Sequence, residues 1–199
     1  MRVLFLTNNF SVVQPLYEWL CAKEGEENVL LLHEPLKYED FQEELCNVEL
    51  IVSYNYDFII SKKIIKMYPN RIFNLHISLL PWNRGCSPNL WSFLHDTPKG
   101  ATIHLIDEGL DTGDILYQSQ VVFDENKETL ESSYNILHAT IQELCIKNWN
   151  ELKHGNFMPK KQTTCNSKKA THKIIEKYNI RWDEKISDVR QRIKLDPLF

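Results

Sequence analysis

Three polar side chains, Asn74, His76 and Asp111, are the first candidates for chemistry in this sequence. Asn74 and His76 are two residues apart in an apolar stretch, so a strand would present both on the same face. An amide NH2 can stabilise a developing oxyanion, and an imidazole can move a proton between reacting groups. Asp111 lies 35 positions after His76 (111 minus 76), so only the tertiary fold can bring its carboxylate close. There it would orient the imidazole, favour its protonated form or hold a water that relays the proton.

The residues around the Asn-x-His pair predict a strand, an ordered loop and a helix. Residues 72–76 form a short apolar run typical of a buried strand, and Pro81 and Gly85 interrupt the apolar stretch that follows. Ser87 and Pro88 are a typical cap and first-turn pair at the start of a helix. Because open α/β sheets bind ligands beyond the carboxyl ends of their strands, we expect a binding site at this loop.

The first half of the chain predicts the frame that would position this loop. Apolar runs alternate with helical patterns, and Ser61 is a candidate cap for one of the helices. We expect an α/β fold, a Rossmann-like, doubly wound, mostly parallel sheet with helices on both faces and a short C-terminal extension. The four apolar runs lie at residues 3–6, 29–32, 50–52 and 72–76.

Two further strands are expected at residues 102–106 and 115–123, on either side of an acidic turn at 107–114. Two glycines in so short a turn permit positive φ angles, which could point Asp111 inward rather than to solvent. We therefore expect the fold to bring this carboxylate to the histidine when neighbouring strands of one sheet bring their ends together.

A long amphipathic helix is expected over residues 130–152, with Gly155 as its natural stop. The expected organisation is a catalytic domain at 1–155 and a short extension at 156–199 that carries one helix. That helix and the apolar stripe of the long helix could form a homodimer contact or close the core of the monomer. The residues on one face of the C-terminal helix are Ile186, Val189 and Ile193.

Composition excludes several classes of protein. The 199 residues carry a formal net charge of −4, which argues against a nucleic-acid scaffold because phosphate-binding surfaces need a basic excess. The five cysteines include no Cys-x-x-Cys pair, so we expect reduced thiols and a cytoplasmic protein. The N-terminus does not have the pattern of a signal peptide, and no apolar run approaches the roughly 20 residues of a membrane span.

Two motifs in order carry a family resemblance. The stretch NLHISLLPWNRGCSPNLW (74–91), followed by GATIHLIDEGLDTGDIL (100–116), resembles the catalytic domain of the folate-dependent formyltransferases. Asn74, His76 and Asp111 fall on the positions that the family uses for catalysis. Taken singly, each residue has an ordinary structural explanation as a turn or core residue. Together, the resemblance implies that they stabilise and protonate the tetrahedral carbon of a formyl transfer.

The resemblance covers residue 1 to about residue 123 and implies 10-formyltetrahydrofolate as co-substrate, with no metal. Family members hold the pterin largely through backbone groups in two segments. These correspond here to Tyr56, Phe58 and Ile60, and to the turn from Asp107 to Asp111. An aromatic-flanked apolar loop can cover a flat heterocycle, although it could also simply pack in the core.

Candidates for contact with the amine acceptor are Asn9, Trp82 and Arg84. Asn9 lies in the turn after the first strand. Arg84 could clamp a phosphate or carboxylate of the acceptor, or brace the loop through carbonyl contacts. Trp82 could stack on a sugar or base, or pack against the protein.

The acceptor is inferred by exclusion within the family. The first turn contains no glycine, unlike the phosphate loop of the purine-pathway members, and the residues after 155 leave too little chain for the tRNA-binding barrel of methionyl-tRNA formyltransferases. We therefore expect formylation of the primary amine of an amino sugar carried on a nucleotide. Formylation of another amine, such as an amino acid or glycinamide ribonucleotide, remains open.

Two other classes of function remain open. One is a ligand-binding module for folate or a nucleotide sugar that has no turnover. The other is a metal-dependent hydrolase, although its spacing matches no recognisable zinc pattern. His104 is expected to be a structural histidine that could contact the site. The metal ligands in the hydrolase reading would be His76, His104, Asp107 and Asp111.

Overall fold

Four short apolar strands form the parallel part of the sheet. The computed structural model describes residues 1–163 and 173–194. Side chains of these strands are buried on both faces of the sheet, which explains why the sequence shows continuous apolar runs rather than alternation. The strands are β1 (Val3–Leu6), β2 (Val29–Leu32), β3 (Leu50–Tyr54) and β4 (Ile72–His76).

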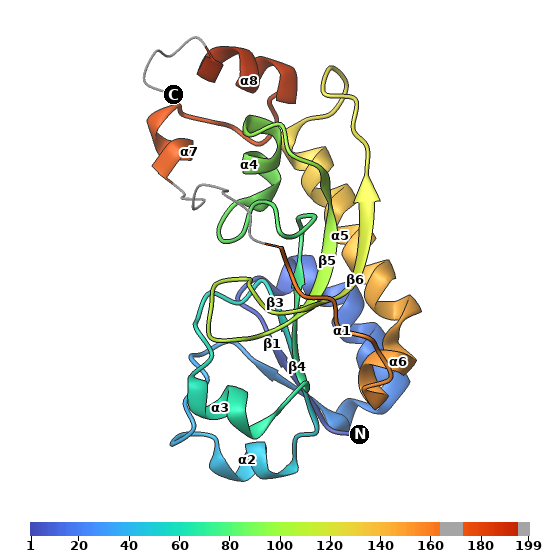
Figure 1. Cartoon of the computed structure of the whole chain (residues 1–199). Coiled ribbons are helices and arrows are strands. Elements are labelled where there is room, and N and C mark those ends of the chain that lie inside the picture. Colours follow the sequence, from blue (N-terminus) through green and yellow to red (C-terminus); the bar gives the residue numbers. More distant parts are fainter. Residues whose placement is uncertain (164–172, 195–199) are drawn as a thin grey trace.

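Two antiparallel strands complete a six-stranded sheet with the order β2-β1-β3-β4-β5-β6 (Figure 1). β5 (Lys99–Leu105) runs antiparallel to β4, and β6 (Ile115–Val121) runs antiparallel to β5. This direction places the end of β5 beside the start of β4, with Leu105 opposite Phe73. The turn after β5 therefore begins at the opposite end of β4 from the loop that follows His76.

Helices cover both faces of the sheet, as expected, because alternate residues of the strands enter two separate apolar clusters. Phe5 belongs to the cluster on one face and its neighbour Leu6 to the cluster on the other. The first face is covered by α1 (Phe10–Glu24), α5 (Leu130–Lys147) and α6 (Trp149–His154). The other is covered by α2 (Gln42–Asn47) and α3 (Lys62–Met67).

The helix boundaries confirm two sequence signals and correct two others. The hydroxyl of Ser61 accepts from the Ile64 N–H at the start of α3, and Gly155 ends α6 with a φ of 73°. The single long helix that the apolar stripe predicted is two helices, because the backbone leaves helical geometry at Asn148. Ser87 has a φ of 50° and makes no side-chain cap, so α4 begins at Pro88 without the expected hydrogen bond.

A third apolar cluster joins the C-terminal helices to α4 (Pro88–Leu94), away from the parallel strands (Figure 1). The partners of α4 in this cluster are α7 (Lys173–Lys177) and α8 (Ile186–Lys194). The apolar face expected on the last helix is buried here, within the chain itself. The division into 1–155 and 156–199 stays a prediction. The residues of the buried face are Ile186, Val189 and Ile193.

The described residues can be examined for membrane-spanning helices and for disulfides. Within residues 1–163 and 173–194 no helix is long and apolar enough to cross a membrane. The cysteines of those ranges are free thiols, and Cys165 lies outside them.

The burial of α8 predicts a stability effect. Ile186 is 0% exposed, so Ile186→Ala should lower the free energy of unfolding by about 2–5 kcal/mol through lost burial and a residual cavity. Ile59→Ala is the matched control, since Ile59 is 92% exposed, and it should change stability by less than about 0.5 kcal/mol. Urea denaturation at several protein concentrations measures both. Equal stability of the two variants would contradict docking of α8 on the core.

Candidate active site

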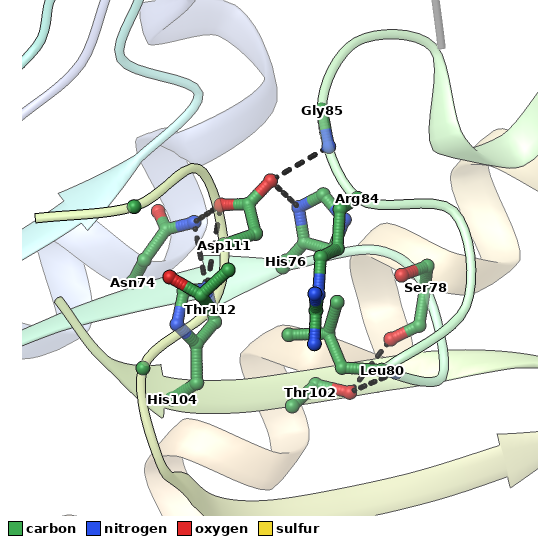
Figure 2. A network of polar contacts seen from close by, with 12 residues as sticks. Asn74, His76, Ser78, Leu80, Arg84, Gly85, Thr102, His104, Asp111 and Thr112 are labelled. Carbon is green, nitrogen blue, oxygen red and sulfur yellow. Dashed lines mark hydrogen bonds and ion pairs between the residues drawn. The ribbon is translucent and has the colours of Figure 1, made fainter. Parts of the chain in front are cut away.

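Neighbouring strands bring an amide and two imidazoles onto one face of the sheet. Asn74 in β4 lies directly opposite His104 in β5, and His76 lies two residues further along β4. Opposed residues of an antiparallel pair point to the same face, so register alone joins Asn74 to His104. Asn74 Nδ2 and His104 Nε2 are 3.2 Å apart (Figure 2).

Asp111 reaches this group because its turn folds back over the sheet. From the sequence we expect the ends of neighbouring strands to bring Asp111 to the histidine. Instead, the turn between β5 and β6 folds back and carries Asp111 there. The Leu105 N–H donates to the carbonyl of Asp114, which closes the turn. A Cβ on Gly113 would lie 1.8 Å from the Leu105 carbonyl oxygen, so only glycine permits this approach. Asp111 itself has a φ of 51°, the positive φ expected from the turn sequence but carried by the aspartate.

The carboxylate of Asp111 lies at the centre of the cluster (Figure 2). Its Oδ2 accepts a hydrogen bond from the Gly85 N–H at 2.8 Å and lies 3.7 Å from His76 Nδ1. Its Oδ1 lies 3.5 Å from His104 Nε2 and 3.4 Å from Asn74 Nδ2. The structure thus brings Asn74, His76 and Asp111 together, and it adds His104 and a backbone N–H.

Burial and nearby charges set the protonation states of His76 and Asp111. Burial lowers the pKa of His76, and the negative charge of Asp111 offsets only part of that effect. Burial alone would raise the pKa of Asp111, but contacts with His76, His104 and Gly85 outweigh it and hold that pKa below its usual range. The site therefore holds a carboxylate beside a neutral imidazole at neutral pH. With His76 neutral, the Gly85 N–H is the contact that stabilises the carboxylate most directly.

Hydrogen-bond partners assign the tautomers of both histidines. His76 Nε2 lies 3.2 Å from the carbonyl oxygen of Asn83, which can only accept, so Nε2 carries the proton. The lone pair of His76 Nδ1 then faces Asp111. By the same reasoning His104 carries its proton on Nδ1, which lies 2.8 Å from the Leu105 carbonyl oxygen, and its Nε2 accepts from Asn74.

The loop after β4 is held by hydrogen bonds to β5 and β6. Thr102 Oγ1 donates to the Ser78 carbonyl at 2.7 Å and accepts from the Leu80 N–H at 3.1 Å. The side chain of Gln118 donates to the Leu80 carbonyl at 2.8 Å. These contacts fix the loop that carries the Gly85 N–H, so that donor is preorganised for the carboxylate of Asp111.

The side chains of the residues expected to bind the folate make contacts of their own within the protein. The hydroxyl of Tyr56 donates to the Glu34 carbonyl at 2.7 Å, and its ring packs on Phe58. Ile60 is buried in the apolar cluster under α3. The carboxylate of Asp107 accepts from the Gly109 N–H and the Thr112 hydroxyl, so it braces its own turn.

The residues expected to contact the acceptor are partly exposed or make contacts with other parts of the protein. Asn9 precedes α1 and accepts from the Ser11 hydroxyl at 3.0 Å. Trp82 is 38% exposed. The guanidinium of Arg84 donates from Nε and Nη2 to Gln162 Oε1, at 3.1 and 2.7 Å. Of the two roles considered for Arg84, bracing of the loop is the one this contact represents, although its partner is a side-chain amide.

The metal-hydrolase reading has no matching geometry in the described part of the chain. There, no group of three or more His, Cys, Asp and Glu side chains is arranged to hold a metal ion. Asp107 would be a metal ligand in that reading, but its carboxylate accepts hydrogen bonds from within the acidic turn.

Sequence reasoning missed two members of the site, the Gly85 N–H and Gln162. It allowed His104 a contact with the site but did not identify its partner, which the register opposite Asn74 supplies. The two missed members lie in loops or the extension, where no periodic pattern predicts a contact.

Comparison with known proteins supplies a family. A model described as formyl transferase matches residues 36–148. A solved structure of the formyltransferase PseJ from Anoxybacillus kamchatkensis, in complex with UDP-4,6-dideoxy-4-formamido-L-AltNAc and tetrahydrofolate, is 35% identical with a TM-score of 0.80 and covers 95% of this chain and 97% of that one. A sugar N-formyltransferase from Shewanella shares the fold, with a TM-score of 0.72 at 22% identity over 92% of this chain and 82% of that one.

Curated relatives that match this chain include methionyl-tRNA formyltransferases. A methionyl-tRNA formyltransferase from Clostridium novyi is 30% identical over 199 residues, which is 98% of this chain and 58% of the relative. The chain spans about half the length of the curated relatives it matches. Since the family model covers more than half of the 199 residues and includes the whole cluster around Asp111, the chain belongs to the formyl transferase family.

Proposed function

We propose that this protein transfers a formyl group from 10-formyltetrahydrofolate to the primary amine of an amino sugar carried on a nucleotide. The observation that carries the proposal is the convergence of Asn74, His76 and Asp111 on one face of the sheet, with a largely buried carboxylate beside a neutral imidazole. The acceptor class is supported by the similarity to PseJ, which extends over nearly the whole of both chains.

Asn74 stabilises the charge that develops on the formyl oxygen. The co-substrate supplies an activated formyl carbon bonded to nitrogen. One hydrogen of Asn74 Nδ2 points to His104, and the other makes a long 3.4 Å contact with Asp111. The second hydrogen is the one available to the formyl oxygen, because a 3.4 Å contact is weak and readily exchanged.

His76 and Asp111 manage the proton. As the acceptor amine forms its bond to the formyl carbon, the lone pair of His76 Nδ1 takes the amine proton. Asp111 Oδ2, 3.7 Å away, stabilises the imidazolium that results. His76 then returns the proton to the folate nitrogen as its bond to the formyl carbon breaks, so the imidazole ends neutral.

The two segments expected to hold the pterin are neighbours, which supports a folate site between them. Lys62 at the start of α3 forms a 2.5 Å ion pair with Glu108 in the acidic turn. Three large apolar side chains of these segments remain exposed and can cover a flat heterocycle. They are Phe58, Ile59 and Leu110.

Methionyl-tRNA is the second candidate acceptor, because the curated relatives carry that name. The chemistry assigned to Asn74, His76 and Asp111 is the same for either amine. The catalytic chemistry therefore does not distinguish the two acceptors, and an assay with each acceptor decides between them.

The decisive test incubates the protein with 10-formyltetrahydrofolate and a panel of amines, and detects the mass gain of one formyl group. The panel contains UDP- and dTDP-linked amino sugars, free amino acids, glycinamide ribonucleotide and methionyl-tRNA. We expect formylation of a nucleotide-linked amino sugar. Formylation of methionyl-tRNA alone would overturn the acceptor, and no formylation of any amine would overturn the reaction.

Removal of the base should separate binding from catalysis. His76→Ala should lower kcat by about 10²- to 10⁴-fold, since the amine proton loses its acceptor, while tetrahydrofolate binding changes little. Steady-state kinetics and calorimetry measure the two quantities. His154→Ala, at an exposed histidine of α6, is the matched control and should behave as wild type. A His76→Ala protein with wild-type kcat would exclude His76 as the base.

Loss of the Asp111 charge should shift the pH profile in a defined direction. Asp111 raises the pKa of His76 against the effect of burial, so Asp111→Asn leaves burial unopposed and lowers that pKa further. The acidic limb of kcat/KM, below which His76 is protonated, should therefore move to lower pH while the maximal rate falls. Asp188→Asn on the exposed side of α8 is the control for a general charge effect. A limb that moves to higher pH would contradict the assigned pair.

A further inference from the structure

The side chain of Gln162 joins two loops of the site. Its Nε2 donates to the carbonyl oxygens of Asp111 at 2.9 Å and Gly113 at 2.6 Å. Its Oε1 accepts both hydrogen bonds from Arg84, at 3.1 and 2.7 Å. One amide thus connects the acidic turn to the loop after β4. We call this set of four hydrogen bonds the Gln162 bridge.

Backbone pairing places Gln162 at this position. Lys160 and Ile115 exchange two hydrogen bonds of 2.8 Å each, as an isolated antiparallel bridge at the start of β6. Gln162 follows two residues later, so its side chain is delivered by a paired backbone. The segment that carries it lies close to the strand that follows the acidic turn.

The chemistry of the bridge requires an amide. Arg84 can only donate and the two carbonyls can only accept, so the partners assign the oxygen and nitrogen of the Gln162 side chain. Both hydrogens of Nε2 and both lone pairs of Oε1 are used. A glutamate would retain the contact with Arg84 but would set a carboxylate against two carbonyl oxygens. A methionine would fill similar space and make none of the four hydrogen bonds.

The Gln162 bridge restrains both partners of the hydrogen bond from the Gly85 N–H to the Asp111 carboxylate. On one side Gln162 binds the main chain of Asp111, whose positive φ persists only where surrounding contacts over-determine it. On the other side it binds Arg84, the residue directly before Gly85, whose N–H donates to Asp111 Oδ2. Movement of either loop would lengthen that 2.8 Å hydrogen bond and displace the carboxylate from His76.

We propose that Gln162 is a positioning residue that sets the place of the Asp111 carboxylate relative to His76. This role rests on the proposed formyl transfer, because it acts through the proton transfer assigned to that pair. Gln162 lies in the segment after residue 155, so the extension contributes to the geometry of the site. Misplacement of a reacting group by about 1 Å can cost on the order of 10²-fold in rate.

The test compares Gln162→Met with wild type in kinetics and in NMR. We expect kcat to fall about 10²-fold, because Asp111 moves away from His76. The acidic limb of the pH profile should move to lower pH, in the same direction as for Asp111→Asn. The Gly85 amide proton should lose the downfield shift that a carboxylate partner causes. A change in stability alone would move neither of the last two quantities.

Two further variants sharpen the result. Gln120→Met, at an exposed glutamine of β6, is the matched control and should behave as wild type. Gln162→Glu keeps the acceptor for Arg84 but opposes the two carbonyls, so its kcat should also fall. Wild-type kcat in Gln162→Glu would show that bracing of Arg84 alone matters and would overturn the positioning of Asp111.

The failure of each proposal is distinguishable. A wild-type protein that formylates no amine contradicts the proposed function, and the Gly85 amide shift still tests the bridge. An active wild-type protein whose Gln162→Met variant retains kcat, pH profile and Gly85 shift contradicts the bridge alone.

Discussion

An ionised carboxylate in a buried place is the constraint on which the rest of the site depends. Burial of a charge is costly unless hydrogen bonds and nearby charges compensate it. Asp111 receives a hydrogen bond from the Gly85 N–H and a longer one from the amide of Asn74. These donors come from the loop after β4 and from β4 itself, so the state of one side chain depends on several segments.

The sheet meets this requirement through its change of direction. Its parallel strands, buried on both faces, provide a frame with a separate apolar cluster on each side. The antiparallel β5 then sets His104 opposite Asn74 and sends its following turn back over the same face. The parallel strands form a rigid scaffold. The antiparallel direction of β5 brings His104 and the turn with Asp111 close to Asn74.

Much of this arrangement follows from local pattern. Continuous apolar runs predict β1 to β4, and the spacing of Asn74 and His76 predicts their common face. The position of Asp111 depends on the antiparallel pairing of β5 with β4. The periodicity of apolar residues predicts neither the register nor the direction of a strand. The same limit hides the partner of His104. The break at Asn148 also escapes prediction, because the apolar stripe continues through it.

The position of Gln162 late in the chain has a consequence for synthesis. The ribosome releases β1 to β6 before it releases the Lys160 and Gln162 segment. A nascent chain can therefore complete its sheet while the acidic turn still lacks the outer restraint on the Asp111 main chain. Formation of the scaffold and arrival of a reactive geometry are then two successive events in translation.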